Sequence, residues 1–171
     1  MFLQGPRRAR VKRREDCGMS YHMEAGYEPK PINVLFVCVG NSCRSQMAEA
    51  FATHIGRGRV RAWSAGSAPL GRILPLTYDV MKEKGLTLEG HISKGLAEVP
   101  MTEMNVIVGM GCEVVCPVPA GFKGRKIEWN IPDPYGGDAD SYRSVRDLIE
   151  RQVTELLKEL VAESRPDAPP G

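Results

Sequence analysis

The sequence lacks the long apolar runs from which membrane-spanning helices are built. No stretch approaches the ~20 consecutive apolar residues that cross a bilayer, and the N-terminus has neither the apolar core nor the cleavage site of a secretory signal. We therefore expect a protein with no membrane association that works in the cytoplasm. With 171 residues, 42% of them hydrophobic, the chain has the size of one domain with a single core, and we expect a monomer.

Basic residues are scarce outside the N-terminal leader. Residues 1–14 carry six Lys and Arg side chains and no acidic one, whereas the rest of the chain holds 17 basic against 21 acidic side chains. A basic leader can be a nucleic-acid arm or a targeting peptide. Residues 1–30, however, are broken by Gly and Pro and show no sustained periodicity, so we interpret them as a disordered extension or as sequence upstream of the true start. The domain has no basic stripe, which predicts no nucleic-acid partner.

The sequence also lacks the pattern of a disulfide framework. A chain without a secretory signal keeps its thiols reduced, so its cysteines are expected to be reactive, metal-binding or simply buried. No second Cys/His pair stands at metal-ligand spacing, which disfavours zinc. The five cysteines are Cys17, Cys38, Cys43, Cys112 and Cys116.

Short apolar runs alternate with amphipathic segments along residues 31–162, and residues 163–171 read as a flexible tail. Strands separated by helices imply parallel crossovers, so the pattern predicts one α/β domain with a parallel sheet. The predicted strands are 32–37, 59–63, 104–110 and 126–129. The predicted helices are 46–55, 74–84 closed by Gly85, and a long one that Asp140 or Ser141 caps and that runs to about Leu160, with Val145, Leu148, Ile149, Val153, Leu156, Leu157 and Leu160 buried.

The loop between the first strand and the first helix carries the pattern Cys-x5-Arg-Ser. A loop that curls around one point turns successive backbone N–H groups inward, and the helix N-terminus adds about half a positive charge, so a tetrahedral oxyanion can bind there. Gly40 and Asn41 tolerate the left-handed backbone of such a curl. The predicted oxyanion-binding residues are Val39, Gly40, Asn41, Ser42, Cys43, Arg44 and Ser45.

The same positive field favours a thiolate at Cys38, which predicts that this residue is a nucleophile. Arg44 offers a planar fork for two oxygens of the anion. Ser45 is placed to donate a hydrogen bond to the Cys38 sulfur. Cys43 has two open interpretations: it forms a protective disulfide with Cys38, or it is a buried, inert thiol.

The segment VCVGNSCRSQMAEAF resembles the phosphate-binding loop and first helix of the low-molecular-weight protein tyrosine phosphatases and of the related thiol-linked arsenate reductases. The resemblance extends over SAGS, MKEKGL, GHISKGL and DPYGG, from about residue 32 to 160. It implies a four-stranded parallel sheet flanked by helices. It also implies that Asp133, held between two prolines, protonates the departing oxygen, a step that contributes about two to four orders of magnitude in rate, with Tyr135 at the mouth of the pocket.

Two activities follow from the resemblance. A reductase needs a second thiol that attacks Cys38 after arsenate has bound, and Cys112 with Cys116 could form that relay, with thioredoxin or another thiol as electron donor. Packing, or half of a zinc site, is the alternative for this pair. Gln46 after Ser45 is similar to the reductases, which favours arsenate over a phosphate ester as substrate. IPDPYGG resembles the phosphatases at least as well, so phosphotyrosine hydrolysis stays the alternative.

Two further expectations complete the analysis. Some of these reductases hold a potassium ion behind the loop, and Asn41, Glu49 and Ser64 match part of that site by resemblance; apart from this ion we expect no bound cofactor. A binding module with a vestigial loop would have lost Cys38, Arg44 or Asp133. All three are present, so we expect an enzyme.

Overall fold

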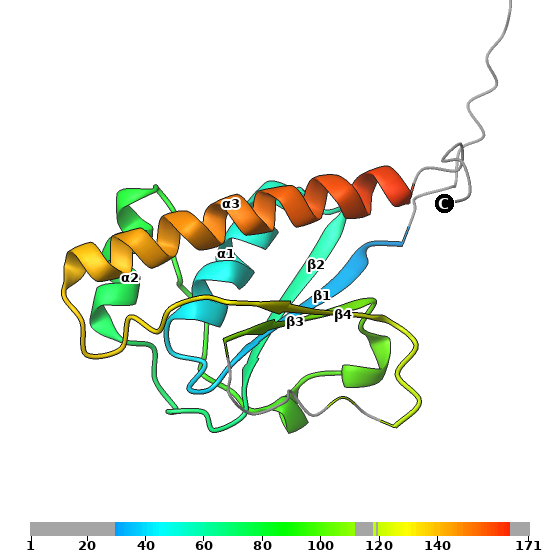
Figure 1. The fold of residues 1–171 in the computed structure, drawn as a ribbon, viewed down its shortest axis with the longest axis horizontal. Helices are drawn as coiled ribbons and strands as arrows, with labels where there is room; N and C mark the ends of the chain where they lie inside the picture. Colours follow the sequence, from blue (N-terminus) through cyan, green and yellow to red (C-terminus); the bar gives the residue numbers. More distant parts are fainter. Residues whose placement is uncertain (1–29, 112–117, 119, 165–171) are drawn as a thin grey trace, which may run out of the picture.

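Four parallel strands form the centre of the molecule (Figure 1). The computed structural model describes residues 30–111, 118 and 120–164. The sheet order is β2-β1-β3-β4, which confirms the predicted single α/β domain with a four-stranded parallel sheet. The strands are β1 (Ile32–Cys38), β2 (Val60–Gly66), β3 (Val106–Met110) and β4 (Arg125–Trp129).

Strand β1 lies between β2 and β3 and is buried on both faces. Its side chains alternate, so Val34 and Phe36 join one core cluster and Leu35 and Val37 the other. A strand that packs on both sides needs an almost continuous apolar run. This requirement explains INVLFV and fixes the end of β1, Cys38, at the carboxyl edge of the sheet, where parallel α/β folds place their ligands.

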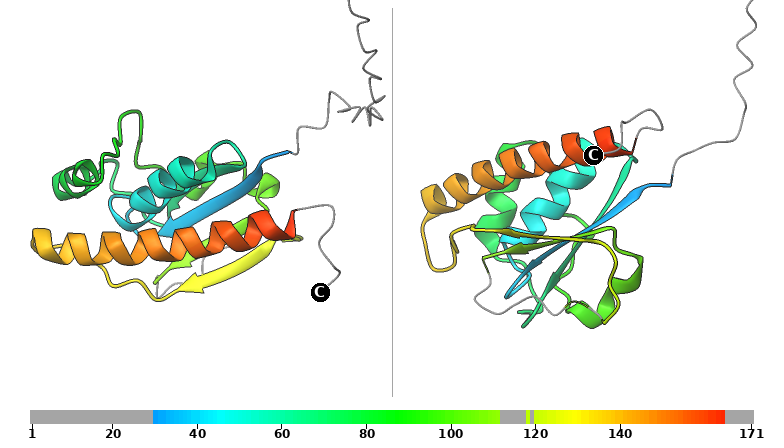
Figure 2. Two further views of the ribbon diagram at one scale, coloured as in Figure 1. Left: turned by 90° about the horizontal axis from the view of Figure 1, so that it is seen from above. Right: turned by 45° about the vertical axis from the view of Figure 1, so that its right-hand side comes forward.

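The three α-helices gather over one face of the sheet. In Figures 1 and 2, α3 runs along this layer, and it packs against both α1 and α2. The other face is covered by two short 3-10 helices and by side chains such as Phe122. The helices are α1 (Arg44–Gly56), α2 (Pro75–Glu83) and α3 (Ala139–Glu163), and the 3-10 helices are η1 (Leu96–Glu98) and η2 (Met101–Glu103).

One predicted helix end is confirmed and another is wrong. Gly85 closes α2 with a φ of 71°, as predicted, and its N–H donates to the Lys82 carbonyl over 2.9 Å. The predicted cap of α3 was wrong by two or three residues. Asp138 is the N-cap, and its carboxylate accepts the Ser141 N–H at 2.9 Å, because two glycines before it allow the chain to turn earlier.

Strand boundaries also differ from the prediction. Strand β2 continues through Gly66 instead of ending at Trp63, because it pairs with β1 along all seven residues. Strand β3 begins at Val106, since the preceding residues belong to η2 and a turn. In α3, Leu148 is only half-buried, while Tyr142 joins the buried stripe. Within the described ranges, no helix is both long and apolar enough to cross a membrane.

Two arginines of α3 fasten α2 to it through one carboxylate. Glu83 accepts hydrogen bonds from Arg143 Nη2 at 2.6 Å and from Arg146 Nη1 at 2.7 Å. These hydrogen bonds, the one from Arg143 first, lower the pKa of Glu83 from 4.5 to about 2. The folded protein therefore binds this proton only at a lower pH than the unfolded chain does.

This contact predicts part of the acid sensitivity. Between pH 4.5 and pH 2 the unfolded chain binds more protons at Glu83 than the folded one, so the stabilisation is complete above pH 4.5 and is lost as the pH falls towards 2. Urea denaturation across this window should show a shallower loss of stability for Glu83→Gln than for the wild type. Glu89→Gln, at an exposed glutamate, is the control. Equal slopes for wild type and Glu83→Gln would show that the ion pairs do not form in solution.

Candidate active site

The predicted oxyanion loop lies between the end of β1 and the start of α1. Cys38 is the last residue of β1 and is 1% exposed, and α1 begins at Arg44. Asn41 has a φ of 44°, the left-handed conformation that was expected here. The loop thus reverses the chain within five residues and places the N-terminus of α1 beside the Cys38 sulfur.

The carbonyl groups of the loop are all held away from its centre. Cys38, Val39, Gly40 and Ser42 accept hydrogen bonds from the N–H groups of Ser67, Ala68, Leu70 and Leu74, at 2.9 to 3.1 Å. For the N–H groups of residues 39–43, no acceptor is found among the described residues. Since the C=O of one residue and the N–H of the next point in opposite directions across a trans peptide, these donors face the inside of the curl. The loop is therefore a cradle of free N–H groups.

Strand β2 supports this cradle from behind. A Cβ atom at Gly66 would lie 2.6 Å from the Val39 carbonyl oxygen, so only glycine lets the strand approach so closely. This contact is the physical reason that β2 extends beyond the predicted end, and it brings Ser64 under the loop.

The direction of the hydrogen bonds around Cys38 follows from the Asn41 amide. Asn41 Oδ1 accepts the Lys94 backbone N–H at 2.8 Å, which fixes the amide orientation. Asn41 Nδ2 then donates to Ser45 Oγ at 2.8 Å and to Ser64 Oγ at 2.9 Å. Ser45 Oγ lies 3.0 Å from Cys38 Sγ. Since Ser45 already accepts from Asn41, its own hydroxyl proton is free to point to the sulfur, which suits a thiolate.

The side chain of Gln46, in the first turn of α1, holds Asn41 in place by hydrogen bonds. Its Nε2 lies 3.1 Å from the Asn41 carbonyl oxygen, 3.0 Å from Asn41 Oδ1 and 3.0 Å from the Ile92 carbonyl oxygen. Its Oε1 therefore faces His91 Nδ1, at 2.9 Å. Because Gln46 Oε1 can only accept, His91 carries a proton on Nδ1. The left-handed turn at Asn41 is thus held by a buried side chain.

The Arg44 guanidinium is held at two of its three nitrogen atoms. Nη1 donates to the carbonyl groups of Met110 at 2.9 Å and Ile131 at 3.2 Å. Nη2 is paired with Asp133 Oδ2 at 2.5 Å. Nε is buried and has no acceptor among the described residues. The guanidinium thus keeps one donor unused and shares another with a carboxylate that is 48% exposed.

A cavity of about 200 Å³ opens above the loop. Cys38 and Arg44 lie in its wall together with Asp133, so the structure brings three of the five predicted catalytic side chains to one site. Its outer part is apolar, and Val39, Leu70 and Tyr135 are 40%, 49% and 64% exposed. The full lining is Cys38, Val39, Gly40, Ser42, Cys43, Arg44, Ala68, Leu70, Asp133 and Tyr135.

Cys43 is the second thiol at this cavity. It is buried, and its Sγ lies 3.9 Å from Asp133 Oδ1. Burial, and then the negative charges of Cys38 and Asp133, raise the pKa of the Cys43 thiol to about 11. Cys43 is a free thiol in this structure, which agrees with the inert rather than the disulfide interpretation.

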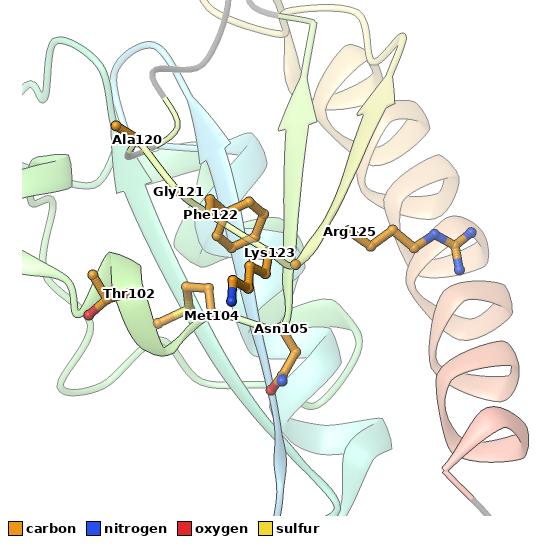
Figure 3. A pocket seen from close by; sticks show the side chains of 9 residues that line it. Thr102, Met104, Asn105, Ala120, Gly121, Phe122, Lys123 and Arg125 are labelled. Atoms are coloured by element: carbon orange, nitrogen blue, oxygen red, sulfur yellow. The ribbon is translucent and has the colours of Figure 1, made fainter.

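A larger cavity of about 490 Å³ lies at the other end of the sheet, before β3 and β4 (Figure 3). Figure 3 shows Phe122 and Met104 in its wall, while the Arg125 side chain turns towards α3, where it pairs with Glu159 at 2.8 Å. Among the described residues, its lining includes no cysteine, histidine or carboxylate. This cavity offers no group for the chemistry predicted at the loop.

The other predicted site residues have different outcomes. Cys112 and Cys116 lie outside the described residues, so their relay stays a prediction. Asn41, Glu49 and Ser64 do lie together beneath the loop, and Glu49 Oε2 accepts the Ser64 hydroxyl at 2.5 Å. Elsewhere in the described part of the chain, no three His, Cys, Asp or Glu side chains gather to hold a metal ion.

Sequence reasoning missed the residues that support the loop from a distance. His91 and Lys94 reach it from a segment without helical or strand periodicity, so no local pattern marks them. Gln46 was noticed only through the family resemblance. A polar side chain on the buried face of α1 was the one available signal of its structural role.

Comparisons with known proteins decide the family. Residues 33–165 match the low-molecular-weight phosphotyrosine protein phosphatase family. The chain belongs to this family. A glutaredoxin arsenate reductase of Synechocystis is 31% identical over 128 residues, which cover 74% of this chain and 97% of the relative. A protein-arginine-phosphatase of Bacillus subtilis is 30% identical over 152 residues, which cover 78% of this chain and all of the relative.

Solved structures of this phosphatase family agree with the fold. An arsenate reductase in the phosphate-binding state superimposes with a TM-score of 0.68 at 30% identity, over 75% of this chain and 98% of the other. A thioredoxin-dependent arsenate reductase of Corynebacterium glutamicum gives 0.67 at 30% identity, over 81% and 65% of the two chains. The protein is therefore an enzyme of the low-molecular-weight phosphatase family with its phosphate-binding loop.

The pairing of Asp133 with Arg44 predicts competition between this carboxylate and a bound anion. In Asp133→Asn, inorganic phosphate should bind about threefold to tenfold more tightly, because a negative charge leaves the cavity and Nη2 no longer has a charged partner. Isothermal titration calorimetry measures this change, and Asp140→Asn, at an 86% exposed carboxylate, is the control. Unchanged or weaker phosphate binding would contradict the competition.

The burial of Cys43 predicts selective alkylation. With a pKa of about 11, its thiol is almost fully protonated at pH 7.5 and should stay unmodified by iodoacetamide while Cys38 reacts. Tandem mass spectrometry of the peptide that contains both residues distinguishes them. Urea-denatured protein, in which both thiols are exposed and react, provides the control. Equal modification of the two residues in the native protein would refute the assignment.

Proposed function

We propose that the protein is an arsenate reductase that uses Cys38 as nucleophile and a thioredoxin-like thiol protein as electron donor. The observation that carries the proposal is the cradle of free N–H groups around Cys38, closed by Arg44, in a chain whose relatives include arsenate reductases. Arsenate, like phosphate, is a tetrahedral oxyanion that fits such a cradle.

The first step forms a bond between Cys38 and arsenic. The Cys38 thiolate attacks arsenate held by the N–H groups of the loop and by the Arg44 guanidinium, and one arsenate oxygen departs. Asp133, at the cavity wall beside Arg44, supplies the proton with which that oxygen leaves as water. The Ser45 hydroxyl lies 3.0 Å from Cys38 Sγ. Its hydrogen bond stabilises the Cys38 thiolate before the attack and again when Cys38 is released as a leaving group.

The second step reduces the arsenic. Another thiolate attacks Cys38 Sγ, a disulfide forms, and the electron pair of the sulfur–arsenic bond stays on arsenic, which leaves as arsenite. We assign the attack to Cys112 and the resolution to Cys116, which ends with a Cys112–Cys116 disulfide. Two thiols of the reductant then reduce this disulfide. Cys43 is unsuited to the attack, because its raised pKa keeps it protonated.

A phosphatase activity is the second candidate. The apolar rim of Leu70, Val39 and Tyr135 is of no use to arsenate itself, but it could contact the organic group of a phosphate ester. The chain also matches the protein-arginine-phosphatase of Bacillus subtilis over the whole length of that relative, at 30% identity. In this alternative, Cys38 forms a phosphocysteine intermediate that water hydrolyses, on phosphotyrosine or a similar ester.

One coupled assay distinguishes the two functions. Arsenate-dependent NADPH oxidation is measured with thioredoxin and thioredoxin reductase, and with glutaredoxin, glutathione and glutathione reductase. Wild type is compared with Cys38→Ser, Cys112→Ser and Cys116→Ser, and the same samples are assayed with an aryl phosphate. Reduction should disappear in all three variants, whereas hydrolysis should disappear only in Cys38→Ser. Cys17→Ser, outside the proposed relay, is the matched control.

The opposite pattern would overturn the proposal. If the wild type reduces no arsenate with either donor but hydrolyses the aryl phosphate, and Cys112→Ser and Cys116→Ser leave that rate unchanged, the protein is a phosphatase. If reduction survives in Cys112→Ser and Cys116→Ser, the relay assignment is wrong although the activity is right.

A further inference from the structure

A charged cluster lies beneath the loop, on the side away from the cavity. Glu49 of α1 is its only carboxylate among the described residues, with a side chain that is 16% exposed. Its Oε2 accepts the Ser64 hydroxyl and lies 3.8 Å from both Lys94 Nζ and His91 Nδ1. This is the place where the family resemblance suggested a potassium ion.

The oxygen atoms of this place are already committed to hydrogen bonds. Asn41 Oδ1 accepts from the Lys94 N–H and from Gln46 Nε2. Ser64 Oγ accepts from Asn41 Nδ2 and donates to Glu49. A hard cation needs several free oxygen ligands, and among the described residues of this cluster only one Glu49 oxygen accepts no hydrogen bond. The residues therefore do not fit a potassium ion.

Positive charge is nevertheless required, because a largely buried carboxylate is unfavourable without compensation. His91 makes no hydrogen bond to this carboxylate, because its Nδ1 proton points to Gln46 Oε1 at 2.9 Å, whereas Glu49 Oε2 lies 3.8 Å away. Lys94, whose side chain is 13% exposed, is then the remaining cation that faces Glu49 in the described part of the chain.

We propose that the Lys94 ammonium is the built-in cation of this site and acts as a positioning residue for Cys38. It neutralises Glu49, so the carboxylate can orient Ser64, Asn41 and Ser45 through hydrogen bonds without its charge opposing the thiolate and the bound oxyanion. Lys94 also fixes the Asn41 amide through its backbone N–H. It touches neither substrate nor sulfur, and the proposal depends on the proposed function only for the identity of the substrate.

The test uses the reactivity of Cys38, which needs no arsenate. The rate of iodoacetamide alkylation of Cys38 is measured against pH by peptide mass spectrometry, in potassium chloride and in choline chloride of equal ionic strength. The wild type should give one profile in both salts. Lys94→Ala should react about threefold to tenfold more slowly at neutral pH, with its midpoint moved to higher pH, and to the same extent in both salts. Lys94→Arg should resemble the wild type.

The controls separate charge at the loop from general stability. Lys84→Ala removes another ion-paired lysine, which contacts Asp147 and Glu150 at 3.1 and 2.7 Å far from the loop, and should leave the profile unchanged. Lys94→Met keeps the aliphatic stem and serves if Lys94→Ala does not fold. A wild type accelerated by potassium, or Lys94 variants that react as fast as Lys84→Ala, would overturn the proposal. Neither result depends on whether the enzyme reduces arsenate.

Discussion

The site depends on the hydrogen bonds that hold the loop carbonyls outward. Neighbouring segments donate to the carbonyl groups of Cys38, Val39, Gly40 and Ser42, and the planar peptide then turns the following N–H groups inward. Without these outer donors, the loop could rotate its peptides and offer oxygen instead of hydrogen to an anion. The rest of the fold, above all the approach of β2 at Gly66, serves to keep that arrangement.

The two charged side chains that line the cavity, Arg44 and Asp133, differ in how they are held. Arg44 is anchored by two backbone carbonyls and cannot leave, whereas Asp133 stands on a half-exposed loop between two prolines. A buried, anchored cation beside a half-exposed carboxylate suits the proposed reaction, in which the anion binds first and the proton is delivered afterwards. In the role proposed for Lys94, the cluster beneath the loop orients the site without contact with the substrate.

Local chemistry explains how much could be predicted from the sequence. Cys38, Asn41, Arg44 and Ser45 lie within eight residues, so their spacing alone predicted one site, and the apolar run of β1 predicted its position at the edge of the sheet. The predicted end of β2 was wrong because it depended on pairing with β1, and the predicted cap of α3 was wrong because the two glycines before Asp138 let the chain turn earlier. His91 and Lys94 are brought to the loop by folding over more than 40 residues, which no local pattern records.

A cradle of backbone N–H groups recognises shape and charge but not the central atom. Arsenate and phosphate present the same four oxygens to it, so abundant phosphate would occupy the cavity as a competitor whenever arsenate is rare. For the proposed reductase, selectivity must arise after binding, from the ease with which arsenic accepts an electron pair that phosphorus does not. An enzyme with this loop would therefore distinguish the two anions by the rate of the chemical step and not by binding affinity.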